Sequence, residues 1–243
     1  MKLHILAIAA HPDDIELSAA GTLLKHIKAG DAVGIVDLTE GELGTRGSVA
    51  MRYEEAENAA KLMGVLVRHN AQMADGFFRN DQENQRKLIA YIRHHQPEIV
   101  IANALEDRHP DHGKGGRLIA DACFLAGLRK IETEWEGQAQ EPWRPKRVFH
   151  MIQDRALEPT FAVDITDTFE QKMEAIKCYT SQFHNPESDE PLTYISTGNF
   201  IETIRSRDSL CGKRIGAQYA EGFVCENLPG IDDLNSLVLP VLA

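Results

Sequence analysis

Residues 3–30 read LHILAIAAHPDDIELSAAGTLLKHIKAG, and this stretch decides the kind of fold. Leu3–Ala9 is a short apolar run that is typical of a buried strand. Leu17–Ala29 carries apolar residues at helical spacing and is followed by a glycine, so it predicts an amphipathic helix. Between them lies a polar turn that contains His11 and two aspartates. The stretch therefore predicts a strand, a turn and a helix in succession.

The same alternation of apolar runs and amphipathic segments continues along the chain. Further strands are expected at Ala32–Leu38, Val65–Asn70, Glu98–Ala102, Val148–Gln153 and Phe161–Ile165. Further helices are expected at Tyr53–Met63, Asn84–His95, Gly115–Leu128, Phe169–Tyr179 and Phe200–Arg214. We expect Thr133–Pro145 to be irregular and His184–Gly198 to be a loop. Alternating strands and helices predict an α/β fold, Rossmann-like, with a mostly parallel sheet covered by helices on both faces.

Composition and charge narrow the class of protein. With 243 residues, of which 43% are hydrophobic and 26% charged, the chain is neither disordered nor fibrous, and residues 1–243 are expected to form a single domain. The net charge of -11 argues against nucleic-acid binding, which needs a basic surface. No apolar run approaches the roughly 20 residues of a membrane helix. The four cysteines form no CxxC pair, which excludes a thiolate zinc cluster of that type. A cytoplasmic protein with no membrane partner is expected.

Two polar clusters follow predicted strands. The first, residues 10–14 (AHPDD), comes directly after Leu3–Ala9, and the second, residues 106–112 (EDRHPDH), comes after Glu98–Ala102. In open parallel sheets, ligands bind beyond the carboxyl ends of the strands, where the strand order reverses. The first and fourth strands of such sheets are often neighbours across that point. We therefore expect the two clusters to face each other.

The residue types in these clusters favour a divalent cation over a nucleotide. The glycine fingerprint of a dinucleotide-binding turn is absent after the first strand, and two adjacent carboxylates would repel a phosphate. His11 and Asp14, together with one histidine of the second cluster, would supply the three protein ligands that are common in catalytic zinc sites. Asp13 would face the water that the metal activates and take its proton as a general base.

The second cluster offers two histidines for that third ligand. Pro110 suits the first turn of a helix, so His112 would lie about one turn further along and point at the metal. His109 would lie at the mouth of the helix, protonated, and face the developing oxyanion. Asp111 is expected to pair with His109 and to raise its pKa.

At these residues the sequence resembles the PIG-L-type zinc deacetylases, which remove the acetyl group from N-acetylglucosamine attached to another molecule. The AHPDD and HPDH turns are the hallmarks of that family. The chain also resembles the bacillithiol-biosynthesis deacetylases, which hydrolyse N-acetylglucosaminyl-malate to glucosaminyl-malate and acetate. That likeness lies in residues 37–47, 52–56, 106–112, 181–186 and 219–223. It extends from about residue 3 to 225, and the tail after Asn227 carries no such signal.

The resemblance implies roles for the residues that match the family's motifs. His11, Asp14 and His112 would bind Zn²⁺, with Fe²⁺ or Co²⁺ as alternatives. Asp13 would be the general base, and His109 would stabilise the oxyanion or protonate the leaving amine. The substrate would be a small sugar conjugate, and the resemblance also suggests a homo-oligomer.

Arginines would recognise the rest of the substrate. The resemblance implies that Arg52 holds a substrate carboxylate, because a guanidinium binds a carboxylate through two parallel hydrogen bonds. Arg46 and Arg108 would assist it. Whether Tyr194 reaches the site stays open at this point. Two other hypotheses remain: a deacetylase of the same family that acts on another N-acetylglucosamine conjugate, and a non-catalytic Rossmann-like nucleotide-binding module.

Overall fold

The parallel sheet expected from the sequence is present in the computed structural model, which describes residues 1–183 and 189–239. In this part of the chain a seven-stranded sheet has the order β3-β2-β1-β4-β7-β9-β8. Its strands are β1 (Ile5–Ala9), β2 (Val33–Thr39), β3 (Val67–Met73), β4 (Ile99–Ala102), β7 (Arg147–Met151), β8 (Phe161–Asp164) and β9 (Ala220–Val224). The five strands from β3 to β7 in this order are parallel to one another, whereas β9 runs antiparallel to both β7 and β8. The α/β, Rossmann-like prediction is confirmed.

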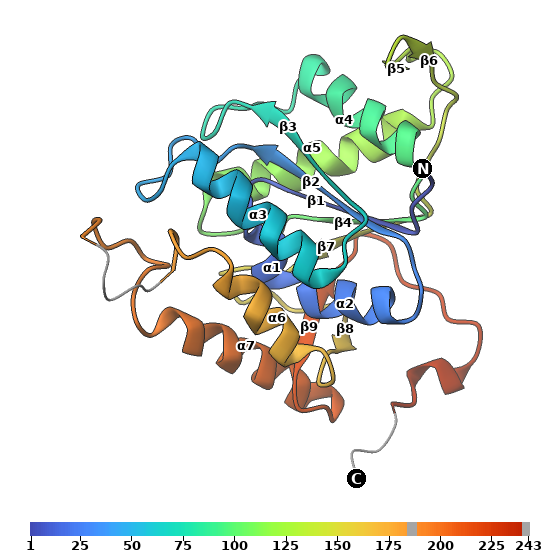
Figure 1. The fold of residues 1–243 in the computed structure, drawn as a ribbon. Helices are drawn as coiled ribbons and strands as arrows, with labels where there is room; N and C mark the ends of the chain where they lie inside the picture. Colours follow the sequence, from blue (N-terminus) through green and yellow to red (C-terminus); the bar gives the residue numbers. More distant parts are fainter. Residues whose placement is uncertain (184–188, 240–243) are drawn as a thin grey trace.

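Helices cover both faces of this sheet (Figure 1). On one face lie α4 (Gln82–His95) and α5 (Pro110–Ala126), and on the other lie α1 (Asp14–Ser18), α2 (Ala20–Lys28), α3 (Val49–Met63), α6 (Phe169–Lys177) and α7 (Phe200–Ile215). A short 3₁₀ helix, Leu234–Leu237, lies in the C-terminal tail. Among the described helices, none is long and apolar enough to cross a membrane.

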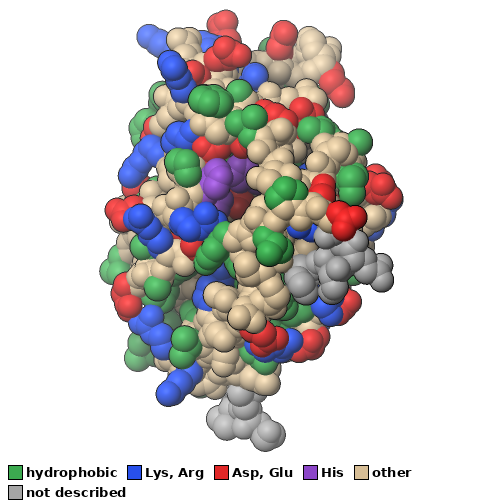
Figure 2. Space-filling model, turned by 90° about the vertical axis from the view of Figure 1, so that its left-hand side faces the viewer, with side chains coloured by type: hydrophobic (Ala, Val, Ile, Leu, Met, Phe, Trp, Pro, Cys, Tyr) green, Lys and Arg blue, Asp and Glu red, His purple; other side chains and the backbone are tan. Residues whose placement is uncertain are grey.

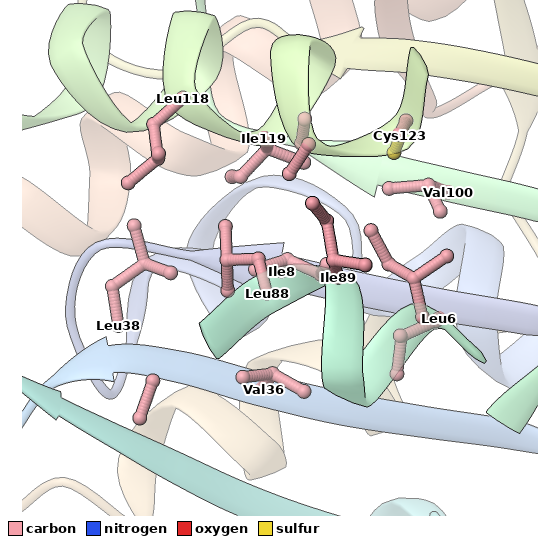
Figure 3. Close-up of a cluster of buried hydrophobic side chains, with 14 of the residues drawn as sticks. Leu6, Ile8, Val36, Leu38, Leu88, Ile89, Val100, Leu118, Ile119 and Cys123 are labelled. Carbon is pink, nitrogen blue, oxygen red and sulfur yellow. The ribbon is translucent and has the colours of Figure 1, made fainter. Parts of the chain in front are cut away.

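The largest apolar cluster lies between the sheet and the pair α4 and α5 (Figure 3). Side chains from both helices point at side chains from strands β2, β1 and β4, and all of them are buried. The members drawn include Leu6, Ile8, Val36, Leu38, Leu88, Ile89, Val100, Leu118 and Ile119. A fully buried Leu or Ile side chain stabilises a fold by about 1.5–3 kcal/mol relative to an exposed one. This packing fixes α5, whose first turn carries part of the second polar cluster.

Glycines let the start of α5 lie against the end of β4. A Cβ atom on Gly116 would come within 2.8 Å of the carbonyl oxygen of Asn103 and 2.9 Å of that of Ala104. Real Cβ atoms do not approach backbone oxygens so closely, so a side chain here would push the helix away from the strand. The glycine therefore sets the short distance between the second cluster and the centre of the sheet.

Besides the ends of several elements, such as α5, which begins at Pro110 rather than Gly115, three parts of the sequence-based prediction differ from the structure. The helix expected at Leu17–Ala29 is two helices, α1 and α2, which meet at Ala19. Strand β9 was not predicted, because its sequence contains a glycine and a buried glutamate. These first two differences are connected by Glu221 of β9. Its carboxylate accepts hydrogen bonds from the backbone N–H groups of Gly21 (3.0 Å) and Thr22 (2.8 Å) at the start of α2. A partner about 200 residues away thus defines where α2 begins.

The third difference lies in the segment Thr133–Pro145, which was expected to be irregular. It contains a small antiparallel hairpin of β5 (Glu134–Trp135) and β6 (Gln138–Ala139). The predicted loop at His184–Gly198 is described only from residue 189 onward, and residues 184–188 lie outside the described part. Residues 189–198 contain no helix or strand.

Candidate metal centre and active site

The two polar clusters meet at the carboxyl ends of β1 and β4. These strands are hydrogen-bonded neighbours, with Ile5 opposite Ile99 and Ile8 opposite Ala102, so the chain segments that follow them start side by side. As a result, the rings of His11 and His112 have centroids 5.7 Å apart. Figure 2 views the molecule from the edge at which the parallel strands end, and it shows histidine side chains in a hollow with acidic side chains beside them.

The Asp14 carboxylate lies between the two histidines. Its Oδ1 is 3.0 Å from Nε2 of His112, and its Oδ2 is 3.6 Å from Nδ1 of His11. Burial alone would raise the pKa of Asp14, but His112 and His11 hold it well below its ordinary value. The carboxylate is therefore ionised, as a metal ligand must be.

The other ring nitrogen of each histidine contacts a second carboxylate. Nδ1 of His112 is 2.5 Å from Oδ2 of Asp107, and Nε2 of His11 is 3.0 Å from Oδ1 of Asp75. Histidines that bind metals usually have this arrangement, because the second hydrogen bond fixes the tautomer and turns the free nitrogen toward the ion. Two imidazoles and a carboxylate with such partners suit a divalent transition metal.

Other combinations of ligand atoms in the same cavity also lie close together. One ligand atom each from His11, His109 and His112 lie within 4.8 Å of one another, and so do those of His11, Asp75 and Asp111. The residues of the cluster can therefore hold a metal ion. That His11, Asp14 and His112 are the ligands stays a prediction.

Asp13 has an unusual backbone and a perturbed side chain. Its φ of 119° lies in a region that residues other than glycine rarely adopt, and such strain occurs preferentially at functional sites. The side chain is buried, with Oδ2 3.4 Å from Nη1 of Arg52. Burial raises the pKa of Asp13 to about 7, and the positive charge of Arg52 opposes that rise. A carboxylate that titrates near neutrality is suited to act as a general base.

His109 and Asp111 do not form the expected pair. The Asp111 carboxylate instead forms an ion pair with Nζ of Lys114 (2.6 Å) and accepts a hydrogen bond from the backbone N–H of Gly76 (2.8 Å). Nδ1 of His109 accepts from the Asp111 backbone N–H at 3.3 Å, because His109 caps α5. Burial, and then the charges of the neighbouring histidines, lower the pKa of His109 rather than raise it. A neutral His109 in this geometry carries its proton on Nε2.

The arginines expected to bind substrate have different surroundings. Arg52 is buried and donates to the carbonyl oxygen of Pro12 and to Oε1 of Gln182 (2.8 Å). Its guanidinium therefore holds the turn at residues 10–14, which follows β1. Arg46 is also buried, and it donates to the carbonyl oxygens of Ser181 (2.9 Å) and Pro191 (3.1 Å). These internal contacts make the two side chains part of the framework around the site.

Arg108 is the most accessible of the three. Its side chain is 48% exposed, and Nε donates to Asp154 at 3.0 Å. The guanidinium lies 4.3 Å from the ring centroid of Tyr194, whose hydroxyl donates to the same Asp154 at 2.8 Å. Arg108 belongs to the second cluster, so Tyr194 contacts the rim of the site through it.

Two polar residues that the sequence analysis did not single out hold Asp14. Asn103 Nδ2 donates to Asp14 Oδ2 at 3.1 Å, and Gln153 Nε2 donates to Asp14 Oδ1 at 2.9 Å. Asn103 also accepts from the backbone N–H of Ala10 and donates to Gln153. Both residues follow strands of the parallel sheet, β4 and β7. The rule that located the histidines, polar residues just beyond strand ends, could have found them too.

Removing the carboxylate behind His112 should weaken metal binding while the metal ligands remain. We expect Asp107→Asn to lower metal affinity by about 10- to 100-fold, the usual cost of losing a partner of a ligating histidine. Competition with a chelator of known affinity measures this change. Asp154→Asn, which alters a carboxylate on the rim, is the matched control. An unchanged affinity in Asp107→Asn would show that this contact does not orient a ligand.

An α/β sheet with two histidines and a carboxylate at the point where strand order reverses is typical of a metal-dependent hydrolase. The model of the PIG-L family, described as GlcNAc-PI de-N-acetylase, matches residues 6–123. The diacetylchitobiose deacetylase of Thermococcus kodakarensis is 30% identical over 241 residues, which cover 93% of this chain and 84% of that protein. The chain belongs to the PIG-L deacetylase family and is an enzyme of the deacetylase class.

Other relatives show the range of this similarity. The conserved protein TT1542 from Thermus thermophilus superposes with a TM-score of 0.85 at 33% identity, covering 96% of this chain and 98% of that one. The 4-oxalmesaconate hydratase of Pseudomonas putida is 29% identical, covering 74% of each chain. A probable N-acetyl-α-D-glucosaminyl L-malate deacetylase 2 of Bacillus anthracis is 25% identical, covering 74% of this chain and 81% of that protein.

Proposed function

We propose that this enzyme hydrolyses the N-acetyl group of an N-acetylglucosamine conjugate, using a divalent metal ion. The observation that carries the proposal is the approach of His11 and His112 to one carboxylate, Asp14, directly beside the buried Asp13. Family membership supports the reaction class, and the diacetylchitobiose and malate deacetylases among the relatives support the sugar. A non-catalytic nucleotide-binding module has no use for such a cluster.

The residues present divide the work of amide hydrolysis. An ion held by His11, Asp14 and His112 would supply Lewis-acid polarisation of the acetyl carbonyl and would lower the pKa of water. Asp13 takes a proton from the attacking water, and the water oxygen forms its bond to the carbonyl carbon. The Nε2–H of His109 donates to the oxyanion that develops. The C–N bond then breaks, the leaving amine takes up the proton that Asp13 received from water, and acetate leaves.

A more specific proposal concerns the group that is attached to N-acetylglucosamine in the substrate. Malate would present two carboxylates, as in N-acetylglucosaminyl-malate of bacillithiol biosynthesis, whereas the second sugar of diacetylchitobiose is neutral. Arg52 and Arg46 are committed to internal contacts, so we assign recognition of a substrate carboxylate to the half-exposed Arg108. The malate conjugate is the specific substrate proposed, and diacetylchitobiose is the main competitor.

An acetate-release assay with both conjugates tests these proposals. We expect the parent enzyme to release acetate from the malate conjugate, and Arg108→Ala to lower kcat/KM on that substrate by about tenfold to a hundredfold. The same variant should barely change activity on diacetylchitobiose. Arg117→Ala is the matched control, because Arg117 is similarly exposed (54%) and also ion-paired, with Glu226 on another part of the surface.

Three other outcomes of the acetate-release assay would change these assignments. A parent enzyme that prefers diacetylchitobiose would overturn the malate assignment while the deacetylase assignment survives. An equal loss on both substrates in Arg108→Ala would assign Arg108 a general role at the rim. If no conjugate releases acetate and the enzyme instead hydrates 4-oxalmesaconate, the proposed deacetylation is wrong.

A further inference from the structure

A second group of ligand-type side chains lies at the opposite end of the parallel strands from the active site. His4 immediately precedes β1, His26 lies in the last turn of α2, and Asp31 lies between α2 and β2. One ligand atom from each of the three lies within 4.8 Å of the other two. The remaining groups with this property in the described residues both contain His11 of the active site. The group of His4, His26 and Asp31 is therefore separate from the catalytic machinery.

The spacing within this peripheral group resembles that at the active site. Nδ1 of His26 is 2.8 Å from Oδ2 of Asp31, and the ring centroids of His4 and His26 are 6.1 Å apart. The corresponding separation of His11 and His112 is 5.7 Å. Two imidazoles and one carboxylate thus converge here almost as closely as the histidines of the candidate catalytic centre do.

Backbone hydrogen bonds hold the three segments in place. The N–H of His4 donates to the carbonyl oxygen of Ala32 at 2.8 Å, and the N–H of Asp31 donates to that of His26 at 3.0 Å. Gly30 has φ 94°, which lets the chain reverse between His26 and Asp31. An ion would therefore find the side chains already on a rigid frame and would lose little free energy in ordering them.

The site is also open to solvent. The side chains of His26 and Asp31 are 35% and 33% exposed, so an ion can enter without local unfolding. A half-exposed site with three protein ligands leaves positions for water. It should bind an ion more weakly than the buried centre, whose Asp14 is enclosed and whose histidines are oriented by further carboxylates.

We propose that His4, His26 and Asp31 form a second metal site, which binds one divalent transition-metal ion. Imidazole nitrogens select Zn²⁺, Ni²⁺, Co²⁺ or Cu²⁺ over Mg²⁺ and Ca²⁺, which prefer oxygen ligands throughout. Zn²⁺ is the probe of choice. A bound ion would tie the start of β1 to the end of α2 and would stabilise the folded chain increasingly as the free ion concentration rises above its Kd.

Zinc stoichiometry tests this site in the full-length enzyme. Chelator-stripped protein is equilibrated with Zn²⁺ at about pH 7.5, above the ordinary pKa of histidine, and bound zinc is counted by mass spectrometry. The parent should bind two ions per chain and His26→Ala one, while His112→Ala should keep only the peripheral ion. His94→Ala, which removes a half-buried histidine outside both groups, should still bind two.

Affinity and stability provide independent readouts. Losing His26 should weaken the peripheral site at least tenfold, about the least that removal of a supporting partner costs. In the His112→Ala background, Zn²⁺ should raise the melting temperature, and the added His26→Ala change should abolish that rise. If His26→Ala does not fold, His4→Ala replaces it.

Two results would overturn the proposal. The first is a parent that binds only one ion, lost in His112→Ala. The second is a His26→Ala variant that keeps two ions with unchanged affinity, in which case the His26–Asp31 contact is simply an ion pair that closes the end of α2. Neither result bears on deacetylation, which depends on the other centre.

Discussion

Asp13→Asn should retain its metal but turn over substrate about 10²–10⁴-fold more slowly than the parent, the usual contribution of a positioned general base. Asparagine has nearly the same shape as aspartate and fits the same buried position, but its amide cannot accept the proton of water. Zinc content and kcat, measured on the same preparation, separate the two effects. Normal turnover in this variant would place the base elsewhere.

The pH dependence of the parent enzyme's activity is a second test of Asp13 as the general base. A general base works only when it is ionised, so activity should rise with pH through the pKa of Asp13 and fall away on the acidic side. Because burial raises that pKa to about 7, the fall should begin near neutrality rather than near the ordinary range of a carboxylate. The acidic limb should be absent from the residual activity of Asp13→Asn. An unchanged limb would assign it to another group.

His112→Ala should fold normally, bind one metal ion fewer than the parent and lose turnover to the level of the stripped enzyme. The side chain lies in the first turn of α5, 3.0 Å from Asp14 and 2.5 Å from Asp107, so its loss removes the predicted ligand and leaves both carboxylates without this partner. The fold should survive, because α5 is held by Leu118 and Ile119 in the core between the helix and the sheet.

Circular dichroism and metal analysis together check this result. His150→Ala is a useful comparison, since His150 is a buried histidine on β7 whose Nδ1 donates to the backbone carbonyl of Asn103 at 2.8 Å. It should keep its full metal content. A His112→Ala variant with an unchanged metal count would remove His112 from the ligand set and favour His109 or Asp75, which share the cavity.

The sequence alone predicted the parallel α/β core and the edge of the sheet at which the two polar clusters meet. Apolar runs and helical spacing predicted most strands and helices from β1 to α7, apart from the β5–β6 hairpin and the division between α1 and α2, since burial of apolar side chains at a fixed period is a local property of the chain. The clusters at residues 10–14 and 106–112 follow strands, and parallel strands end at one edge. Their meeting therefore followed from topology, and the pairing of β1 with β4 confirms it.

Only the tertiary structure decided which partner each polar group has. The Asp111 carboxylate contacts Lys114 and Gly76 instead of the His109 ring, and Arg52 holds Pro12 and Gln182. The partners that hold Asp14, and the carboxylate of Glu221 at the start of α2, come from segments far along the chain. A hydrogen bond forms only when donor and acceptor atoms on such segments lie within a few tenths of an ångström of about 2.9 Å. Residue spacing predicts which edge of the sheet a side chain reaches, whereas the packed fold sets the direction in which it points.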